Sequence, residues 1–454
     1  MLKISEKSNP NYLAKVVRID NLRKHSNADK LQITTIDFQN VITGLDCKEG
    51  DIYVYFPLEC AINKEFLSWS NSFQDKELNV DKTQAGFFNK HGRVRAVKLR
   101  GELSQGYIIP ATVLEEWLRV VLNKDTTVAG YNTDNVGKEF DSYEDIIICK
   151  KYIPNGRTQG SGNNKQQGKS PRISRLVEGQ FLLHNDTENL RKNIHKLELS
   201  DIIGIHYKKH GTSFVVGNVL TKKKLSWKDK VAKFFGIKVV EKNYDIIYSS
   251  RNVVKNQYET ANVGHYYDVD IWGIVKEELK SKIPKGYTLY GEILGYLPSG
   301  KMIQKDYDYG CKEGEHKTYI YKISFTNEDG VVSYLTDKQI EEFCENRGLL
   351  YKNTLIYYGS VYDYIGGNYL LANTEDWREV FIKHLEEKYN EKDCYMCTNK
   401  VPEEGVVLRI EHLDRYEAYK LKSARFLEHE TKVLDSEEAN IEDELPESSL
   451  LETM

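Results

Sequence analysis

The sequence HYKKHGTSFVVGNVL, residues 206–220, decides the fold of the larger part of this 454-residue chain. The β-branched and aromatic residues that follow Ser213 predict a strand, and Lys208 stands where that strand begins. A lysine amine at such a position can attack a nucleotide phosphate, and Gly211 lets the backbone approach the phosphate. Short matches of this kind also arise by chance, so the assignment depends on the motifs that follow.

Further short motifs follow Lys208 along the chain. Each combines polar residues with a strand-like run, and none is specific alone. In order they are Ser250-Arg251-Asn252, Tyr290-Gly291-Glu292, Tyr319-Ile320-Tyr321-Lys322-Ile323, Glu404-Gly405-Val406-Val407-Leu408-Arg409 and Lys420-Leu421-Lys422. In this order and spacing the chain resembles the covalent nucleotidyltransferases, the superfamily of DNA ligases, RNA ligases and mRNA capping enzymes.

Two further features narrow the resemblance to RNA ligases. His210, where the superfamily more often has Asp, together with IQKDYDYG at 303–310, is similar to the RNA ligase 2 type. The N-terminal half is similar to the OB domain of the nick-sealing RNA ligases of the Deinococcus and Naegleria type. The segments that carry this similarity are KHSNADKL at 24–31, VITGLDCKEGDIYVYFPLE at 41–59 and RVRAVKLRGELSQGYIIP at 93–110.

The expected fold class is α+β. Short strands between residues 13 and 109 predict an OB-type β-barrel over 1–112. A connecting segment, 113–176, contains the polar linker NGRTQGSGNNKQQGKSP at 155–171. We predict an adenylyltransferase domain built on antiparallel sheets over 177–427, with flanking helices at 186–197, 226–235, 337–347 and 375–389. The acidic segment 428–454 is predicted to be a disordered tail.

The resemblance implies an ATP-dependent RNA ligase that joins a 3′-hydroxyl to a 5′-phosphate, at nicks in duplexes, through a covalent AMP on Lys208. Glu292 and Glu404 match family carboxylates that hold Mg²⁺ or Mn²⁺ through water. Arg251 matches an arginine that contacts phosphate or the RNA end. The residues expected to contact the nucleotide are His210, Gly211, Glu292, Tyr321, Glu404, Lys420 and Lys422, with Tyr321 stacked on adenine and Tyr319 as the competing candidate.

Three positions depart from the family pattern. His210 lacks the anionic acceptor that Asp offers to metal-bound water, which leaves metal coordination there open. Tyr207 replaces a glutamate that often precedes the nucleophile in relatives, which leaves adenine recognition open. Lys322 stands where relatives commonly have Asp, so we expect a more positive pocket.

The charge distribution favours a polyanionic partner. The net charge is -4, yet residues 428–454 carry ten acidic residues and one lysine, so the rest of the chain is basic.

Lys224 and Lys228, beside Trp227 on a predicted helix, are candidate RNA contacts, with Val231, Phe234 and Phe235 expected to pack inward. Arg93 and Arg95, on one face of a predicted strand, are candidates as well. A solvated surface would show the same patterns. The implied partner is RNA, as a nicked duplex or an RNA–DNA hybrid.

Other features limit the class of protein. No apolar run approaches the roughly 20 residues of a membrane helix, and the polar start MLKISEKSNP is no secretory leader. With seven scattered cysteines, we expect an intracellular monomer, cytoplasmic or in the nucleoid, that does not bind membranes. Cys394 and Cys397 form a Cys-x-x-Cys pair without two further ligands nearby in the sequence, so we do not expect zinc.

Alternative functions stay open. A DNA nick ligase or a capping nucleotidyltransferase would use the same lysine. A non-catalytic RNA-binding protein with a decayed transferase domain belongs to another class. The presence of Lys208, of both glutamates and of the lysine pair argues against decay.

Overall fold

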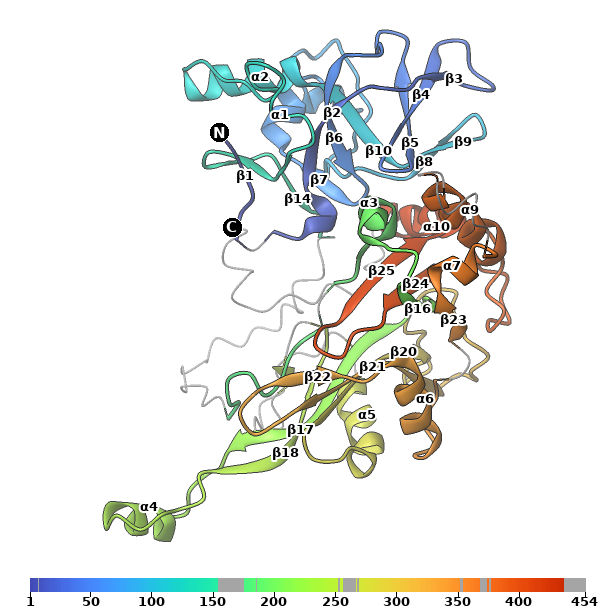
Figure 1. Ribbon diagram of the computed structural model, residues 1–454. Helices are drawn as coiled ribbons and strands as arrows, with labels where there is room; N and C mark the ends of the chain where they lie inside the picture. The colour runs from blue at the N-terminus through green and yellow to red at the C-terminus, as the bar shows by residue number, and fades with distance from the viewer. Residues whose placement is uncertain are drawn as a thin grey trace. The chain divides into compact units, whose positions relative to one another are not determined.

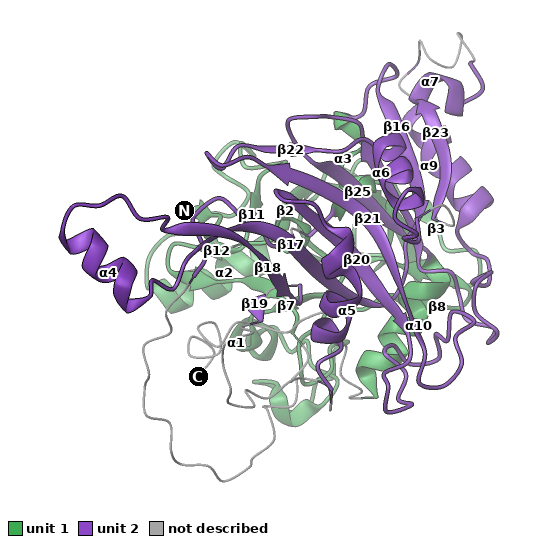
Figure 2. Ribbon diagram, turned by 90° about the horizontal axis from the view of Figure 1, so that it is seen from below, with its two compact units in different colours: residues 1–154, 188–196, 424–437 green, residues 155–187, 197–423, 438–454 purple. Residues whose placement is uncertain are grey.

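The computed structural model describes residues 1–6, 8–153, 175–184, 186–251, 254–255, 267, 269–351, 354–367, 374 and 377–436. Contacts divide the chain into two compact units, shown in separate colours in Figure 2. Unit 1 comprises residues 1–154, 188–196 and 424–437, and unit 2 comprises 155–187, 197–423 and 438–454. These divisions differ from the predicted boundaries at 112 and 427. The predicted linker, 155–171, lies outside the described residues.

Unit 1 is built from short antiparallel strands, in agreement with the predicted OB-type barrel. Its largest sheet has the order β10-β6-β2-β11, and a second has the order β3-β4-β5. The core packs around Phe56, Phe66 and Trp117. The strands are β1 (Leu2–Lys3), β2 (Ala14–Arg18), β3 (Arg23–Lys24), β4 (Leu31–Ile36), β5 (Gln39–Gly44), β6 (Ile52–Pro57), β7 (Cys60–Ile62), β8 (Val97–Leu99), β9 (Glu102–Ser104), β10 (Gly106–Pro110), β11 (Glu139–Phe140), β12 (Ser142–Tyr143), β13 (Ile146–Ile147), β14 (Cys149–Lys151) and β15 (Glu188–Asn189). The helices are α1 (Lys64–Trp69), α2 (Ala111–Leu122), α3 (Leu190–Asn193) and α10 (Ala424–Asp435).

Helix α10 changes two predictions. It shows that the acidic segment predicted to be disordered from residue 428 begins as a helix, which continues to Asp435. Asp435 forms ion pairs with both Arg93 (2.8 Å) and Arg95 (3.0 Å). Arg93 is only 1% exposed and also pairs with Glu59. The two arginines share a face, as predicted, but the burial of Arg93 argues against its predicted contact with RNA.

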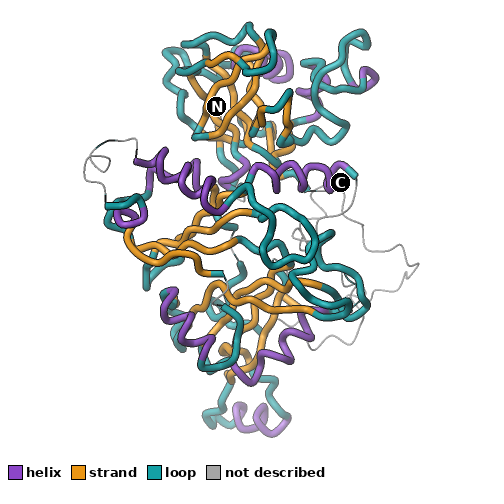
Figure 3. Tube along the Cα trace, turned by 90° about the vertical axis from the view of Figure 1, so that its right-hand side faces the viewer, coloured by secondary structure: helices purple, strands orange, loops and turns teal. Residues whose placement is uncertain are grey.

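Unit 2 is built on two antiparallel sheets. One contains neighbouring strands in the order β25-β24-β16-β23, and the other has the order β19-β18-β17-β20-β21-β22. In Figure 3 helices flank the strands of this unit. The strands are β16 (Ile202–Tyr207), β17 (Thr212–Lys222), β18 (Lys242–Ser249), β19 (Val254–Lys255), β20 (Tyr287–Gly295), β21 (His316–Thr326), β22 (Val332–Tyr334), β23 (Leu355–Ser360), β24 (Gly405–Ile410) and β25 (Glu417–Lys422). The helices are α4 (Trp227–Phe234), α5 (Ile271–Leu279), α6 (Asp337–Glu345), α7 (Val361–Tyr364) and α9 (Trp377–Tyr389).

Most predicted helices of the catalytic region are present. Those predicted at 226–235, 337–347 and 375–389 are confirmed as α4, α6 and α9. Thr336 caps α6 through the predicted capping box. The helix predicted at 186–197 is reduced to α3 and a 3-10 turn at Ile194–Lys196. Helix α5, which no pattern predicted, packs Trp272 and Val275 into the core of the six-stranded sheet.

The six-stranded sheet has one apolar face and one polar face. Phe214, Ile293 and Ile320 belong to the core with α5 and α6. Because side chains alternate along a strand, Ser213 and Glu292, which pair across β17 and β20, lie on the opposite face. This second face carries the polar residues of the motifs.

A β-bulge in β21 places an extra residue on that polar face. Tyr290 pairs with Lys322, whereas the next residue, Gly291, pairs with Ile320, so Tyr321 has no cross-strand partner of its own. Strict alternation would turn Lys322 toward the core. The bulge instead turns it toward the Tyr290 ring, 4.0 Å from the ring centroid. Tyr321 and Lys322 therefore both face the polar side, which a period of two could not predict.

Gly291 is required by the close approach of two strands. A Cβ at this position would lie 2.3 Å from the carbonyl oxygen of Tyr319 and 2.5 Å from the ring of Phe214. The first contact is with backbone, which cannot rotate away. The glycine beside Glu292 therefore allows β20 and β21 to pair at the bulge.

We predict that Gly291→Ala destabilises the protein by about 1–3 kcal/mol, because the added methyl group overpacks a closed sheet. Chemical denaturation followed by circular dichroism measures this difference. Gly44→Ala is the matched control, because Gly44 also lies in a strand without a positive φ and an added Cβ there would meet only the exposed Asp46 side chain, which can rotate away. Equal stability of Gly291→Ala and the unmodified protein would contradict the packing argument.

Candidate functional site

Lys208 lies in the turn that joins the two sheets of unit 2. Strand β16 ends at Tyr207 and β17 begins at Thr212, so the turn belongs to neither sheet. The backbone N–H of Lys208 donates to the carbonyl oxygen of Gly405 (2.8 Å). Its Nζ lies 2.7 Å from Oε1 of Glu404, a carboxylate that is 1% exposed, while the lysine side chain is 16% exposed. The sequence separates these residues widely, and the pairing of β16 with β24 brings them together.

The segment 303–310 holds this turn from the opposite side. The Tyr309 hydroxyl accepts a hydrogen bond from the backbone N–H of His210 (2.7 Å). Gln304 Nε2 donates to the carbonyl oxygen of Gly211 (2.7 Å), and the Tyr307 hydroxyl donates to the carbonyl oxygen of Pro402 (2.7 Å). Segment 303–310, which is similar to the RNA ligase 2 type, therefore fixes the backbone just after Lys208 and just before Glu404.

His210, two residues after Lys208, contacts an aromatic ring and lies near Glu404. Its ring stacks edge-on against Tyr307 (5.0 Å between centroids), and Nδ1 lies 4.0 Å from Glu404 Oε2. Close packing requires glycine at position 211, because a Cβ there would lie 2.4 Å from the carbonyl oxygen of Ile293. Contact of either residue with the nucleotide stays a prediction.

Glu292 and Tyr321 lie together on the polar face. The Ser213 hydroxyl donates to Oε1 of Glu292 (2.6 Å). Burial, with the Glu292 carboxylate as the next cause, raises the pKa of Tyr321 well above its ordinary value, so its hydroxyl keeps its proton. That hydroxyl hydrogen-bonds Nδ1 of His184 (3.0 Å).

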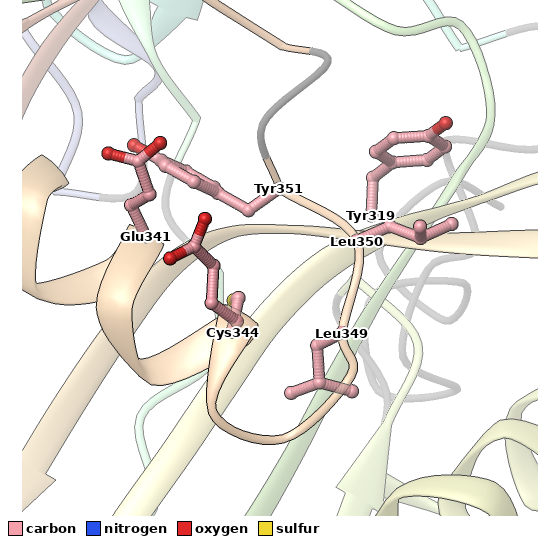
Figure 4. A pocket seen from close by; sticks show the side chains of 7 residues that line it. Tyr319, Glu341, Cys344, Leu349, Leu350 and Tyr351 are labelled. Carbon is pink, nitrogen blue, oxygen red and sulfur yellow. The ribbon is translucent and has the colours of Figure 1, made fainter.

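Tyr319, the competing candidate for adenine stacking, borders a separate pocket. Its backbone bridges to Leu350 beside a cavity of about 170 Å³ that α6 lines. In Figure 4 the Tyr319 ring points away from Cys344 and Leu349, which line this cavity. Tyr319 pairs with Glu292 across the sheet, so its ring lies on the polar face next to that carboxylate.

The lysines of β25 complete a cluster of cations. Burial first, and then the neighbouring charge of Lys422, lower the pKa of Lys420 to about 8. The charges of Lys208 and Arg251 act on Lys420 in the same direction, while Asp186 opposes them. Arg251 forms an ion pair with Asp186. The structure therefore brings together Lys208, Arg251, Lys420 and Lys422, as the motif order predicted.

His184 and Asp186 are site residues that sequence reasoning missed. Burial, followed by the charges of Arg251 and Lys322, lowers the pKa of His184 well below its ordinary value. The imidazole is therefore neutral and can exchange a hydrogen bond with Tyr321. No spacing or motif marked either residue, because they precede the nucleophile and reach the site only through the fold.

Lys322 is buried in a cage of aromatic rings. Its Nζ lies 4.0 Å from the centroid of Tyr290, 4.5 Å from that of Tyr416 and 5.4 Å from that of Tyr334. Burial, with Arg409 as a second cause, lowers the pKa of Lys322 to about 7. The predicted extra positive charge of the pocket is thus present in full only below that pH.

The donor set suits a hard cation that keeps most of its water. Among the described residues, no group of three or more His, Cys, Asp and Glu side chains is placed to hold a metal ion. Glu292 and Glu404 offer oxygen atoms, which Mg²⁺ and Mn²⁺ prefer, and these ions bind through water and substrate phosphates when few carboxylates are available.

Tyr207, Cys394 and Cys397 lie close to Lys209, the residue that follows Lys208. Lys209 is buried, with its Nζ 5.0 Å from the Tyr207 ring and 4.7 Å from the Tyr395 ring. The lysine that follows the nucleophile in sequence therefore points into a tyrosine cage. Tyr207, in place of the family glutamate, forms part of this cage.

The lysines predicted to contact RNA lie on α4, but the helix packs differently from the prediction. No residue of α4 is buried. Phe234 is 85% and Phe235 is 72% exposed, and Val231 is exposed as well. The expectation that these three residues pack inward was wrong, because the helix extends beyond the sheet that would have covered them.

Comparisons with known proteins agree with this architecture. A family model described as an OB-fold domain matches residues 13–111. No curated protein sequence matches the chain. The structure is similar to Naegleria gruberi RNA ligase in a lysine-to-methionine mutant with AMP and Mn, at 18% identity and a TM-score of 0.55, covering 92% of this chain and 98% of that one. A lysine-to-alanine mutant of the same ligase with ATP and Mn matches at 15% identity and a TM-score of 0.56, covering 93% and 99%.

The chain has the fold of an OB-domain-bearing RNA ligase. A third similar structure, a glutamate-to-alanine mutant of the Naegleria ligase with ATP and Mn, matches at 17% identity over 92% of this chain and 99% of that one, with a TM-score of 0.55. The α+β class and the OB-type N-terminal domain are therefore confirmed. In the part of the chain that the structure describes, no helix combines the length and the apolarity needed to cross a bilayer.

We predict that Lys322→Met stabilises the protein most below pH 7. The unfolded lysine has a pKa of about 10.4 and the folded one about 7, so the unfolded state binds more protons between these values. Stability of the unmodified protein should therefore rise with pH above 7, and the advantage of the variant, a few kcal/mol at most, should shrink. Urea denaturation at pH 6, 7, 8 and 9 measures this.

The matched control is Lys338→Met, which removes an exposed lysine that also faces a tyrosine ring, that of Tyr358 at 4.7 Å. Its effect on stability should stay constant over the same pH range. A constant effect of Lys322→Met would show that the cage does not hold a neutral amine.

Proposed function

We propose that this protein is an ATP-dependent RNA ligase that forms a covalent AMP on Lys208 and seals a break between a 3′-hydroxyl and a 5′-phosphate in a duplex. The observation that carries the proposal is the ion pair between Lys208 and the buried Glu404, with Lys420, Lys422 and Arg251 grouped around it. A cluster of four cations suits a polyanionic ligand such as a nucleotide triphosphate or an RNA end. The Naegleria ligase of the same fold was solved with ATP, AMP and Mn, which supports the assignment.

The first step is the adenylation of Lys208. Its amine attacks the α-phosphorus of ATP, forms a P–N bond and displaces pyrophosphate, and this requires the neutral amine. The Glu404 carboxylate at 2.7 Å stabilises the ammonium form and is also placed to accept its proton. A divalent cation, when bound beside Glu404 and Glu292, would neutralise phosphate charge and weaken that hold on the ammonium.

The two later steps use the same residues. The 5′-phosphate of the RNA attacks the lysine-bound AMP and forms an RNA–AMP pyrophosphate bond, which frees Lys208. The 3′-hydroxyl then attacks the activated 5′-phosphate and releases AMP. Lys420 and Lys422, on one face of β25, neutralise charge on the phosphate that is transferred, while Arg251 is placed for the RNA 5′-phosphate. Tyr321 is the aromatic ring proposed to stack on adenine.

We predict that Lys208→Ala abolishes covalent labelling by α-³²P-ATP, because the variant removes the amine that forms the ion pair with Glu404. Among the described residues, Lys208 is the one lysine that forms an ion pair with Glu404. Gel electrophoresis after denaturation measures the label. The matched control, Lys209→Met, removes the adjacent lysine, which faces the tyrosine cage, and should retain most of the label. Undiminished labelling of Lys208→Ala would refute the proposal.

Substrate choice separates the alternative functions. With ATP and Mn²⁺, we predict sealing of a nick whose 3′-hydroxyl strand is RNA, at a rate at least tenfold above that for an all-DNA nick. Labelling by GTP in place of ATP would favour a capping nucleotidyltransferase, and equal sealing of the DNA nick would favour a DNA ligase. RNA binding without any covalent AMP would favour the non-catalytic alternative.

A further inference from the structure

Residues 222–242, which we call the arm, extend the hairpin of β17 and β18 beyond the rest of the sheet. Figures 1 and 2 both show α4 at the far end of this hairpin. From Ser213 in the site to Lys222, β17 advances nine residues, which is on the order of 30 Å at the rise of a strand. The other strand, β18, returns to Ser249, next to Arg251. Both strands that carry the arm therefore run from the site.

The helix of the arm has an apolar face that nothing in its own unit covers. Trp227, Val231 and Phe234 follow one another at helical spacing, and Trp227 is 71% exposed. Phe235 packs edge-on against Phe234 and is itself exposed. Exposed aromatic clusters of this kind mark interaction surfaces in soluble proteins.

The helix is held by local bonds instead of packing. Ser226 and Asp229 form a reciprocal capping box, and Lys233 pairs with Glu241 across the arm. A helix of two turns is marginal without tertiary packing, even with a good cap. Its apolar face is therefore expected to gain stability from a partner.

The charge of the arm identifies the chemistry of that partner. The arm contains eight lysines and only two acidic residues, Asp229 and Glu241, whereas the whole chain is net negative. Lysines bind the phosphates of a polyanion, and exposed aromatic rings stack on bases that are not already stacked in a duplex. Lysines and aromatic rings interleaved on one short element are typical of surfaces that bind single-stranded nucleic acid.

We propose that the arm binds unpaired nucleotides of the RNA substrate, with Trp227 and Phe234 stacking on bases and the surrounding lysines holding the backbone. This inference rests on the proposed function for the identity of the polyanion. It goes beyond that function because it assigns a second contact, on the order of 30 Å from Lys208, to an unpaired segment that flanks the break. RNAs with a single-stranded extension or an open loop near the break are then the preferred substrates.

The test measures RNA binding by fluorescence anisotropy without ATP, so that its outcome does not depend on ligase activity. The full chain is titrated against a short blunt nicked duplex and against the same duplex with a single-stranded extension. Trp227→Ala with Phe234→Ala should weaken binding of the extended RNA by roughly tenfold or more, because the double variant removes both rings on which bases would stack. Binding of the blunt duplex should change less than twofold.

The matched control is Tyr131→Ala, which removes an aromatic ring that is 91% exposed in unit 1. It should leave binding of both RNAs unchanged. Equal losses on both substrates, or no loss on either, would overturn the proposal. So would variants that lose binding to anionic phosphatidylserine vesicles or lose self-association in sedimentation while keeping their affinity for the extended RNA. Failure of covalent labelling with intact binding of the extended RNA would contradict the ligase function and leave the arm as an RNA-binding element.

Discussion

The ion pair between Lys208 and Glu404 is the interaction on which the arrangement of unit 2 depends. A carboxylate that is 1% exposed is costly to bury unless a cation meets it, and Lys208 is the cation that does so, at 2.7 Å. The two residues come from the ends of neighbouring strands, β16 and β24, and the turn at Lys208 is also the connection to the second sheet. One buried charge pair therefore fixes the junction between two sheets.

The backbone around this pair is fixed by groups that take no part in the chemistry. Tyr309, Gln304 and Tyr307 bond the main chain at His210, Gly211 and Pro402. In the proposed reaction Lys208 would gain from such pre-organisation, because small displacements lower the rate of phosphoryl transfer. The identity of residue 210, histidine or aspartate, matters less for this task, since the bond is made by its backbone N–H.

Each sheet of unit 2 carries a desolvated lysine of the site, Lys322 on β21 of the six-stranded sheet and Lys420 on β25 of the other. Lys420 and Lys322 both have lowered pKa values, for which desolvation is the largest cause. Strand β17 of the six-stranded sheet continues to the arm, where the lysines are exposed to solvent. Positive charge is thus desolvated at Lys322 and Lys420 and exposed on the arm.

The sequence by itself determined the α+β class, the OB-type start, most helices of unit 2 and the order of the site residues, because these follow from local periodicity, capping and motif spacing. Tertiary structure alone decided three matters. The bulge in β21 turned Lys322 to the polar face, which alternation cannot predict. The fold brought His184 and Asp186 to the site from a segment without a motif, and it covered Arg93 with α10. Burial by distant elements determines whether a charged side chain can meet a ligand, and sequence patterns carry no record of those distant contacts.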